Sequence, residues 1–457
     1  MTDITVDPQA ISRLGEDMQG DVLGAGDDDY DQARRVWNAM ADRHPAAIAH
    51  CAGATDVARA LDHAREQGLP VAVRGGGHSI PGFSTCDGGL VVDLGPMKGI
   101  QVDPETKTVR AEGGVRWGEL DHQTQRFGLA TTGGVVSTTG IAGLTLGGGR
   151  GWLMRAHGLA CDNLVAADVV CADGSVVRAD TEEHPDLFWG LRGGGGNFGI
   201  VTSFTYRLHE VGPVVAGGSV AYEPSRARSV LGAFREQTVQ APDELSMQTA
   251  LMDIGNPVAA IAACYAGPVE EGERLFEPLR RVAPPLADAL GQLPYVNLQS
   301  ALDGAFPPGQ FHYTTSRSVD DLTDNILDLL VEHWAQAPRG PTPWILVEHM
   351  GGAVARVPAD ATAYGDRHAT YEVSVWANWT DPQRTDDYVT WTRTLAGALD
   401  GYACGGYVNY IEDDGERAVR TAYGQHYGRL QALKDRYDPD NIFRFNQNIR
   451  PSQGGRR

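Results

Sequence analysis

The first regular pattern in the chain is an amphipathic helix followed by a strand and a glycine loop. Apolar residues recur at helical spacing over residues 55–68, where Thr55 can cap the start of the helix and Gly68 can end it. Residues 70–74 form a short run rich in β-branched side chains, which predicts a strand. The sequence Gly-Gly-Gly-His-Ser follows at once, at residues 75–79. The pattern therefore predicts the order helix, strand, glycine loop.

Strands and short helices continue up to about residue 210. Between residues 165 and 180, two apolar runs flank Asp173-Gly174, a dipeptide that supplies the positive φ angles of a tight hairpin. Other strand patterns lie at residues 90–94, 108–112 and 200–208, and helix patterns lie at residues 116–127, ended by Gly128, and 185–191. The first region is therefore predicted to mix helices and strands.

The character of the chain changes near Val211. The glycine runs stop there, prolines become frequent, and residues 250–266 and 371–379 have strand patterns. Near the end, residues 423–437 predict a helix. Since a chain of 457 residues is long enough for two or three domains, we expect a second, sheet-rich domain to begin near Val211.

The strong negative charge argues against several kinds of partner. With 38 basic and 59 acidic residues, the chain has a formal net charge of −21 at pH 7. Nucleic acids are bound by clusters of Lys and Arg, and anionic membranes repel an acidic surface. No run approaches the about 18 apolar residues that span a bilayer, and the first residues lack the basic flank and apolar core of a signal peptide. We expect no nucleic-acid partner, no membrane association and a cytoplasmic location.

Cysteine and histidine are not arranged as metal ligands. The six cysteines lie far apart without a CxxC pair, and the 13 histidines form no HExxH or His-x-His pattern. The sequence therefore predicts no metal site, and it predicts that most cysteines are reduced and buried.

Three glycine-rich loops stand out, at residues 74–82, 133–151 and 192–199. Successive glycines let several backbone N–H groups point into one concavity, which suits a phosphate, although tight turns alone are the alternative for each loop. No GxxxxGK[ST] motif occurs. Residues 194–199 match GxGxxG, but they follow a helix and lead into a strand, the reverse of the dinucleotide fingerprint. Pro81 stands where a GxSxG nucleophile elbow needs its second glycine, which disfavours a serine hydrolase.

Four motifs lie in register along the chain: RGGGHSIPG, then GGVVSTTGIAGLTLGGGRGWLMRAHGLACDNL, then PDLFWGLRGGGGNFGIVTSF, and finally YVNY with FRFNQNI. Together they resemble the FAD-linked oxidases similar to berberine bridge enzyme, within the vanillyl-alcohol oxidase fold superfamily. The resemblance runs from about Tyr30 to Pro451 and is faint in the middle.

The resemblance implies an α+β, two-domain PCMH-type FAD-binding fold, in which a central antiparallel sheet covered by helices forms the substrate domain. We expect residues 1–209 to form the N-terminal part of the FAD-binding domain and residues 210–405 the substrate-binding domain. Residues 406–457 are expected to be a C-terminal segment, with the berberine-bridge-like motif, that returns to the FAD-binding domain.

The resemblance also implies how the FAD is attached. In such enzymes the histidine of the R-G-G-G-H-S loop, here His78, is bonded through its ring to the 8α methyl of the flavin; an ordinary core histidine is the alternative. Some relatives add a bond from a cysteine to flavin C6, but Val136 occupies that position here and cannot form a thioether. A single covalent link is therefore expected. Cys161 lies outside that position and is predicted to be an inert buried thiol.

Further residues are expected around the cofactor on the same basis. The loop at residues 137–140 and the nearby glycines correspond to the part that wraps the pyrophosphate, Ile200 and Val201 to positions near the adenine, and Asn446 and Asn448 to a terminal N-x-N that contacts the flavin. Turn capping is the alternative for the asparagines. The expected cofactor-binding residues are Arg74, Gly75, Gly76, Gly77, His78, Ser79, Gly82, Ser137, Thr138, Thr139, Gly140, Gly143, Gly147, Gly148, Ile200, Val201, Asn446 and Asn448.

Residues 407–410 resemble a strand that presents an active-site tyrosine to the substrate. Period-two alternation would point Tyr407 and Tyr410 to opposite faces unless the strand bends, and we favour Tyr410 as the catalytic residue, with Tyr407 as the second candidate. A tyrosine that acts as a base near pH 7 needs its pKa lowered by about 3 from its usual value near 10. It therefore needs a cationic or donor-rich neighbour.

Candidate neighbours lie in the middle region, where the resemblance is faint. His349, Arg367 and His368 could supply the charge or the donors, and Tyr371-Glu372 resembles a sheet segment that lines the substrate pocket. Packing in an ordinary sheet is the alternative for each of them. The expected pocket residues are His349, Tyr371 and Glu372.

The implied reaction is the oxidation of a small organic substrate. A base removes a proton from an O–H or N–H group while a hydride passes from the adjacent carbon to flavin N5, and O₂ is the expected electron acceptor. Alcohols, sugars, alkaloid amines and polyketide-type metabolites all fit. The alternatives are a flavin-dependent oxygenase of secondary metabolism and a non-catalytic flavin or small-molecule binder. The sequence indicates no oligomeric state.

Overall fold

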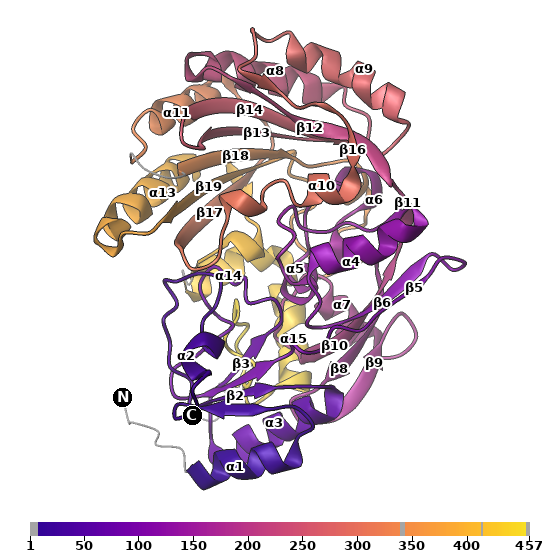
Figure 1. Cartoon of the computed structure of the whole chain (residues 1–457), viewed down its shortest axis with the longest axis vertical. Coiled ribbons are helices and arrows are strands. Elements are labelled where there is room, and N and C mark those ends of the chain that lie inside the picture. Colours follow the sequence, from indigo (N-terminus) through magenta and orange to yellow (C-terminus); the bar gives the residue numbers. More distant parts are fainter. Residues whose placement is uncertain (1–7, 339–342, 413–414, 454–457) are drawn as a thin grey trace.

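The computed structural model describes residues 8–338, 343–412 and 415–453. The chain forms two halves that lie one above the other (Figure 1). The upper half is built around one large sheet, and the lower half contains smaller sheets together with both the N-terminal and the C-terminal segments. We call these the large-sheet half and the small-sheet half.

The large sheet has nine strands within the described residues, and its pairings are antiparallel. Their order is β15-β12-β14-β13-β18-β19-β17-β20, and β16 also pairs with β12. The strands are β12 (Val214–Tyr222), β13 (Leu245–Asp253), β14 (Pro257–Tyr265), β15 (Ala287–Asp288), β16 (Gly291–Pro294), β17 (Phe311–Val319), β18 (Pro343–His349), β19 (Tyr371–Trp379) and β20 (Ala403–Gly405).

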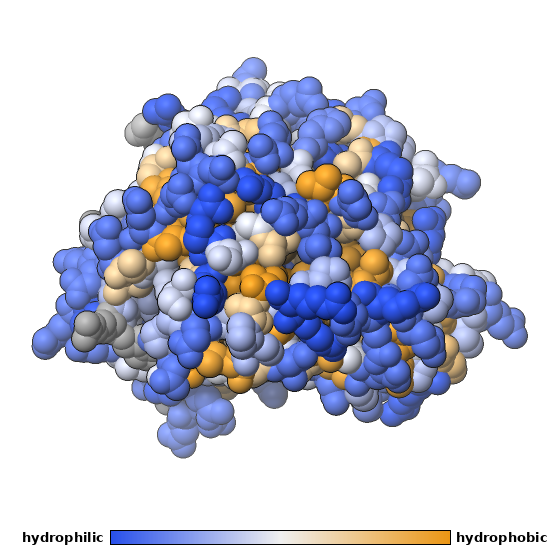
Figure 2. Space-filling view, turned by 90° about the horizontal axis from the view of Figure 1, so that it is seen from above, coloured by the Kyte–Doolittle hydropathy of each residue, from blue (hydrophilic) through white to orange (hydrophobic). Residues whose placement is uncertain are grey.

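One face of the large sheet is covered by helices (Figure 1). These are α8 (Ala227–Val239), α9 (Val269–Arg280), α11 (Asp324–Trp334) and α13 (Thr385–Leu399). Side chains alternate along each strand, so Ile345 and Val347 of β18 pack in the core under the helices, while Trp344, Leu346 and Glu348 face the small-sheet half. Seen from above, over α8 and α9, most surface side chains are hydrophilic and the apolar ones form small separate groups (Figure 2).

In the part of the chain that the structure describes, the small-sheet half holds three sheets. A four-stranded sheet has the order β1-β2-β4-β3, in which β4 pairs in parallel with β2 and β3. A five-stranded antiparallel sheet has the order β5-β6-β10-β8-β9, and β7 pairs with β11. The strands are β1 (Val22–Gly24), β2 (Ala47–His50), β3 (Val71–Arg74), β4 (Leu90–Asp93), β5 (Ile100–Asp103), β6 (Thr108–Glu112), β7 (Leu129–Ala130), β8 (Leu164–Val170), β9 (Val176–Ala179), β10 (Ile200–Arg207) and β11 (His209–Glu210).

The remaining helices are mostly short. They are α1 (Pro8–Asp17), α2 (Tyr30–Ala33), α3 (Ala54–Gln67), α4 (Trp117–Thr124), α5 (Ile141–Leu146), α6 (Met154–His157), α7 (Pro185–Leu191), α10 (Tyr295–Gln299), α12 (Ala353–Arg356), α14 (Glu416–Tyr423) and α15 (Tyr427–Tyr437). The 3₁₀ helices are η1 (Gln125–Phe127), η2 (Ala160–Asp162), η3 (Pro224–Arg226), η4 (Asp303–Ala305), η5 (Pro382–Arg384), η6 (Val408–Tyr410) and η7 (Gly424–His426). Within the described residues, no helix combines the length and the apolar character that crossing a bilayer requires.

Most predicted elements are confirmed, with three corrections. The first predicted helix begins at Ala54 after Gly53, so Thr55 does not cap it, although Gly68 does end it with a left-handed φ of 66°. The helix predicted at residues 423–437 begins only at Tyr427, as α15, because α14 ends at Tyr423 and the chain turns at Gly424, where φ is 49°, into the 3₁₀ helix η7. The predicted strand at residues 407–410 is the 3₁₀ helix η6. The Asp173-Gly174 hairpin is confirmed as β8 and β9.

The C-terminal segment returns to the small-sheet half. Val408, Tyr423, Leu430 and Ile449 are buried in the same core as the strands β6, β8 and β10. The large sheet begins with β12 and its last strand along the chain, β20, ends at Gly405. We therefore keep 1–209, 210–405 and 406–457 as the proposed domain division.

Candidate active site

A long cavity lies where the two halves meet. Its walls come from segments that are far apart in the sequence: the loop after β3, the segment before and within α5, the turn before β10, the inner face of β18 and β19, and the C-terminal segment. Antiparallel strands of the large sheet thus form one wall, and the glycine loops form the others. Such a cavity at a domain interface is the usual place for a cofactor and its substrate.

His78 lines this cavity on the loop that follows β3. Its Nε2 lies 2.9 Å from Thr138 Oγ1, and its ring stacks on the indole of Trp37 with centroids 4.8 Å apart. Burial, and to a smaller extent the positive Arg116 and the nearby His312, lower the pKa of His78 to about 3. The imidazole is therefore neutral at physiological pH, with a lone pair on one ring nitrogen.

The glycine loops around His78 touch one another closely. A Cβ atom at Gly76 would lie 2.4 Å from the backbone nitrogen of Gly140, so only glycine permits this approach. The backbone N–H groups of residues 76–79 have no hydrogen-bond acceptor within the described part of the chain. Residues 76–79 are half-buried and line the cavity, so this row of donors suits an anionic ligand such as a diphosphate.

The structure brings most of the expected cofactor-binding residues to the cavity. Those that line it are Gly75, Gly76, Gly77, His78, Ser79, Thr139, Gly140, Gly143, Ile200, Val201 and Asn446. The others lie behind the wall and do not line the cavity; they are Arg74, Gly82, Ser137, Thr138, Gly147, Gly148 and Asn448.

Two of the residues behind the wall show how it is held. The buried guanidinium of Arg74 donates to the carbonyl oxygens of Ser84 and Ala33, which fixes the loop that carries His78. Ser137 donates through its backbone N–H and its hydroxyl to the carboxylate of Asp303, at 2.8 and 2.5 Å. Asp303 belongs to η4 beside the large sheet, so this contact ties the two halves together.

The C-terminal segment closes another part of the cavity. Asn446 donates to the carbonyl oxygens of Gly196 and Phe443, while its Oδ1, which is buried, accepts no hydrogen bond from the described residues. Lys434 and Asp438 hold this segment from beneath with a fully buried ion pair of 2.7 Å. Lys434 also donates to the carbonyl oxygen of Asn197, so the same side chain braces both loops.

The wall formed by the large sheet is aromatic with one carboxylate. Trp344 and Trp376 face each other across β18 and β19, and Phe306 contacts both rings. Glu348 is 2% exposed; its Oε1 accepts a 3.4 Å hydrogen bond from Gln248, and its Oε2 has no partner among the described residues. Burial raises the pKa of Glu348 to about 7, the positive Arg150 lowers it and Glu372 raises it.

Tyr407 and Tyr410 both line the cavity, because η6 places residues three apart on the same side. Their ring centroids are 4.8 Å apart. The cation beside them is Arg150, whose guanidinium carbon lies 4.1 Å from the centre of the Tyr407 ring. Burial raises the pKa of Tyr407 to about 12, and burial together with Glu348 raises the pKa of Tyr410 well above its ordinary value. The lowered tyrosine pKa that catalysis by a phenolate requires is therefore not found.

The expected pocket residues of the middle region divide between the two faces of the sheet. Glu372 lies on the inner face and forms a 3.2 Å ion pair with Arg150, which lines the cavity, but Glu372 itself does not line it. Tyr371 and His349 do not line the cavity; they lie on the helix-covered face, where Tyr371 bonds Thr238 and His349 contacts Arg155. This separation follows from the alternation of side chains along a strand.

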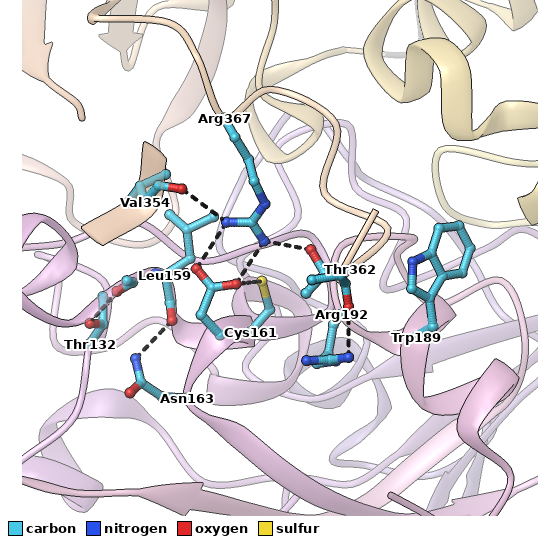
Figure 3. Close-up of polar contacts among 12 residues, drawn as sticks. Thr132, Leu159, Cys161, Asn163, Trp189, Arg192, Val354, Thr362 and Arg367 are labelled. Atoms are coloured by element: carbon cyan, nitrogen blue, oxygen red, sulfur yellow. Dashed lines mark hydrogen bonds and ion pairs between the residues drawn. The ribbon is translucent and has the colours of Figure 1, made fainter. Parts of the chain in front are cut away.

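Arg367, His368 and Cys161 do not line the cavity either. Arg367 forms a bidentate ion pair with Asp162 and donates to Thr362 and to the carbonyl oxygen of Val354 (Figure 3). Cys161 is fully buried beside this ion pair, and burial raises the pKa of its thiol well above the ordinary value, whereas His368 is exposed. The Asp162–Arg367 pair joins the loop before β8 to the loop before β19.

The cavity residues that sequence reasoning missed include Trp37, Arg150, Glu348 and Gln447. Two of them carried a signal. Arg150 is the one charged residue within the glycine run of residues 147–151, and Glu348 is the single carboxylate in the largely apolar strand Pro343–His349. A charged residue in such a setting is rarely buried without a partner or a function. Trp37 lies in a segment without a distinctive pattern, and Gln447 is the middle residue of the N-x-N in FRFNQNI, where only the asparagines were singled out.

These observations fit the FAD that the motifs imply. The free N–H groups of residues 76–79 suit the diphosphate, the unpartnered Asn446 Oδ1 offers an acceptor, and the rest of the lining is largely apolar, as rings require. The fold and the cavity together define a flavin-dependent oxidoreductase.

Comparison with known proteins identifies the family. Residues 45–180 match the family described as FAD binding domain, and residues 406–450 match the family described as berberine and berberine like. An FAD-linked oxidoreductase of Dictyostelium discoideum is 32% identical over 450 residues, which cover 97% of this chain and 98% of the relative. The chain therefore belongs to the FAD-linked oxidoreductases similar to berberine bridge enzyme.

Named relatives and solved structures agree. The (R)-6-hydroxynicotine oxidase of Paenarthrobacter nicotinovorans is 29% identical over 95% of this chain and 97% of the relative. The crystal structure of 6-hydroxy-D-nicotine oxidase from Arthrobacter nicotinovorans superposes with a TM-score of 0.85 at 28% identity, covering 94% of this chain and 98% of that chain. The xylooligosaccharide oxidase from Myceliophthora thermophila, solved with xylobiose, superposes with a TM-score of 0.86 at 26% identity. The match covers 97% of this chain and 99% of that chain. The predicted fold class, the FAD cofactor and the oxidoreductase class are confirmed.

Proposed function

We propose that this chain is an oxidase whose FAD is bonded once, through the His78 ring to the flavin 8α methyl, and that Glu348 is the base that takes a proton from a small substrate. The observation that carries the proposal is Glu348: a buried carboxylate with an unpartnered oxygen lines the same cavity as His78. When bound, FAD accepts a hydride at N5 and passes the electrons on, for which we propose O₂ as the acceptor.

The surroundings of His78 support the single link. The ring is neutral, so a nitrogen lone pair is available for bonding, and Thr138 and Trp37 fix its plane. Val136 lines the cavity at the position where some relatives carry a second, cysteinyl link. A valine side chain has no atom that can form that bond.

Glu348 is better suited than Tyr410 to accept a proton near pH 7. A general base is most effective when its pKa is near the working pH, and the pKa of Glu348 is about 7. The pKa of Tyr410 is raised, so its hydroxyl stays protonated and serves as a hydrogen-bond donor to the substrate oxygen or nitrogen. Tyr407 accepts hydrogen bonds from Asn409 and from the backbone N–H of Gly149, so we propose that it positions the loop and lines the substrate space.

The wall beside Glu348 favours a substrate with an apolar or aromatic body. Trp344, Trp376, Phe306 and Leu346 offer ring faces and aliphatic surface but few hydrogen-bond partners. Each hydroxyl that is buried without a partner costs about 1–3 kcal/mol, which penalises a sugar with many hydroxyls. We therefore propose an aromatic alcohol or amine, oxidised at the carbon that bears the O–H or N–H group.

The test is an anaerobic screen in which loss of the visible absorbance of oxidised flavin reports substrate oxidation. Aromatic amines, aromatic alcohols and xylobiose are compared at equal concentration. Reduction by the aromatic compounds and not by xylobiose is expected, and reduction by xylobiose alone would overturn the proposed substrate class. Exposure to isotopically labelled O₂ then separates an oxidase, whose product gains no label, from an oxygenase.

Glu348→Gln tests the base with little change of shape. We expect flavin reduction by the best substrate to slow by about 10² to 10⁴, with FAD still attached. Tyr410→Phe removes one hydrogen bond, so we expect only about a fivefold loss. If Glu348→Gln reduces its flavin at a normal rate while Tyr410→Phe does not, Tyr410 is the base.

A further inference from the structure

The guanidinium of Arg150 is buried at the junction of the two halves and is held from several sides. It follows the glycines of residues 147–149 and lines the cavity. Its Nη2 donates to the hydroxyl of Tyr364 at 2.8 Å, its Nη1 lies 3.2 Å from Glu372 Oε2, and its carbon lies over the Tyr407 ring. The side chains of the Arg150–Glu372 pair are 2% and 0% exposed.

Glu372 and Glu348 are partners across neighbouring strands. The Cα atoms of the two residues pair directly between β18 and β19, and both side chains lie on the inner face of the sheet. Two like charges in this relation repel each other, since their Cβ atoms are roughly 5 Å apart. One arginine can neutralise one of the two carboxylates, so the second is left with a charge that nothing on the protein fully balances.

The contacts show which carboxylate is matched to the arginine. Glu372 forms the ion pair with Arg150 and also accepts a hydrogen bond from the hydroxyl of Ser318. Glu348 receives only the long hydrogen bond from Gln248. Arg150 is kept on Glu372 because Tyr364 fixes it from the other side, and Tyr364 itself lies against Gly148, where a Cβ would lie 2.7 Å from its ring.

We propose that Arg150 and Glu372 form a positioning pair, two opposite charges fixed together beside Glu348, that sets how readily Glu348 takes the substrate proton. The inference rests on the proposed function, because it assumes that Glu348 is the base. Arg150 favours the ionised form of Glu348, and Glu372 opposes it. The balance leaves a buried carboxylate that can be ionised near neutral pH instead of being held permanently neutral by burial.

Other titratable groups around Glu348 come from every neighbouring element. They are Tyr407, which precedes η6, Tyr410 of η6, and Glu372 of β19. Tyr364 and Asp366, from the segment before β19, interact with the Arg150–Glu372 pair. Strand β13 contributes the amide of Gln248, and β17 contributes the hydroxyl of Ser318. Arg150 is the cation among these groups, so it is the residue whose removal has the largest effect on Glu348.

Two substitutions that act in opposite directions test the pair. In a plot of the rate of anaerobic flavin reduction against pH, the acidic limb is the fall in rate at low pH, where Glu348 is protonated. In Arg150→Met the carboxylate of Glu348 loses a stabilising charge, so this limb is expected to move to higher pH. In Glu372→Gln a repelling charge is lost, so the same limb is expected to move to lower pH. Each shift should be about one pH unit or more. The double variant Arg150→Met/Glu372→Gln should return towards the wild-type profile.

Opposite shifts of the limb in Arg150→Met and Glu372→Gln distinguish this role from a general disturbance of the structure, because such a disturbance would not be expected to move the limb in opposite directions. Ser374→Ala, on the same face of β19 and without a change of charge, is the matched control and should not move the limb. Shifts in the same direction, or no shift in either variant, overturn the inference. If the acidic limb persists in Glu348→Gln, Glu348 is not the base and the proposed function is wrong. If the limb disappears in Glu348→Gln but is unmoved in Arg150→Met and Glu372→Gln, Glu348 is the base and the inference about the pair is wrong.

A second readout does not depend on turnover. The protonated carboxyl of Glu348 gives an infrared C=O band that Glu348→Gln lacks, so the band can be titrated in the resting holoenzyme. The midpoint should fall in Glu372→Gln, which keeps the shape of the side chain and so preserves folding. An unchanged midpoint in folded Glu372→Gln overturns the inference even where Arg150→Met does not fold.

Discussion

The indole of Trp37 lies between two imidazoles, with its ring centroid 4.8 Å from that of His78 and 3.7 Å from that of His312, each at an interplanar angle of 18°. Burial lowers the pKa of both histidines, to about 3 and about 4. The three rings therefore form a neutral stack. It fixes the plane of the His78 ring.

Removal of the stack should slow the attachment of FAD. Trp37→Leu keeps apolar volume but loses the ring contact, which is worth about 0.5–1.5 kcal/mol, so we expect covalent attachment to slow by about 2- to 10-fold. The fraction of flavin that stays with acid-precipitated protein, followed over time after FAD is added to apoprotein, measures this rate. Trp37→Phe, which keeps a ring, should lie closer to wild type, and equal rates in all three proteins would contradict the role.

His78→Ala should leave FAD bound but not bonded. Acid precipitation is expected to release the flavin from this variant and to retain it in the wild type. Because Val136 lines the same cavity, His78→Ala/Val136→Cys offers a thiol at the position of the second link, and we expect it to recover acid-stable flavin. His78→Ala/Val136→Ala is the control that should stay acid-labile. Acid-stable flavin in His78→Ala alone would place the bond elsewhere.

Asp121 makes stability fall as pH rises. Its carboxyl is buried in α4 and accepts a 2.9 Å hydrogen bond from Gln299; burial raises its pKa to about 7 from an ordinary 3.8, and Gln299 opposes this. The folded state therefore binds the proton more tightly than the unfolded state. The stabilisation of the folded state by this proton is complete below about pH 4 and is lost as the pH rises through about 7.

Asp121→Asn removes this dependence. The melting temperature of the variant relative to wild type should rise between about pH 5 and about pH 8, with a total effect on the order of 4 kcal/mol at most. Asp440→Asn at an exposed position is the control and should track wild type. A difference between Asp121→Asn and wild type that does not change with pH would show that Asp121 titrates normally.

Lys434→Met should destabilise the protein by about 3–5 kcal/mol, because it leaves Asp438 buried without its partner. Unfolding by denaturant measures the loss. In Lys434→Met/Asp438→Asn no buried charge remains. The backbone N–H groups of Ile442 and Phe443 each donate to a different oxygen of Asp438, so the single amide oxygen of the asparagine can keep one of these two hydrogen bonds. The double variant is therefore expected to be more stable than Lys434→Met, and the reverse order would contradict the role of the ion pair.

Sequence patterns predicted the local elements well. The strands at residues 108–112 and 371–379 and the helix at residues 185–191 have the predicted bounds, because alternation and helical spacing report burial directly. The segment at residues 407–410 was predicted wrongly as a strand. Its alternating residues mimic a strand, but the chain turns there to bring Tyr407 and Tyr410 to one side.

The site could be predicted only in part. The loop that carries His78 was visible because several glycines and a histidine occur together. The partners of the tyrosines could not be predicted from the sequence. Arg150 and Glu348 are separated by 198 positions in the sequence, and they come together only because a loop packs against a sheet. Strand alternation could have separated Glu372 from Tyr371 and His349, once the inner face of the sheet was known.

The walls of the cavity have a consequence for the order of events during synthesis. Residues 443–447, which close one side, leave the ribosome well after the loop of His78. A nascent chain that stops before Phe443 has its imidazole but lacks this side of the cavity. We therefore expect FAD to be bound only after Phe443 has been synthesised, and a chain that stops before Phe443 to be colourless.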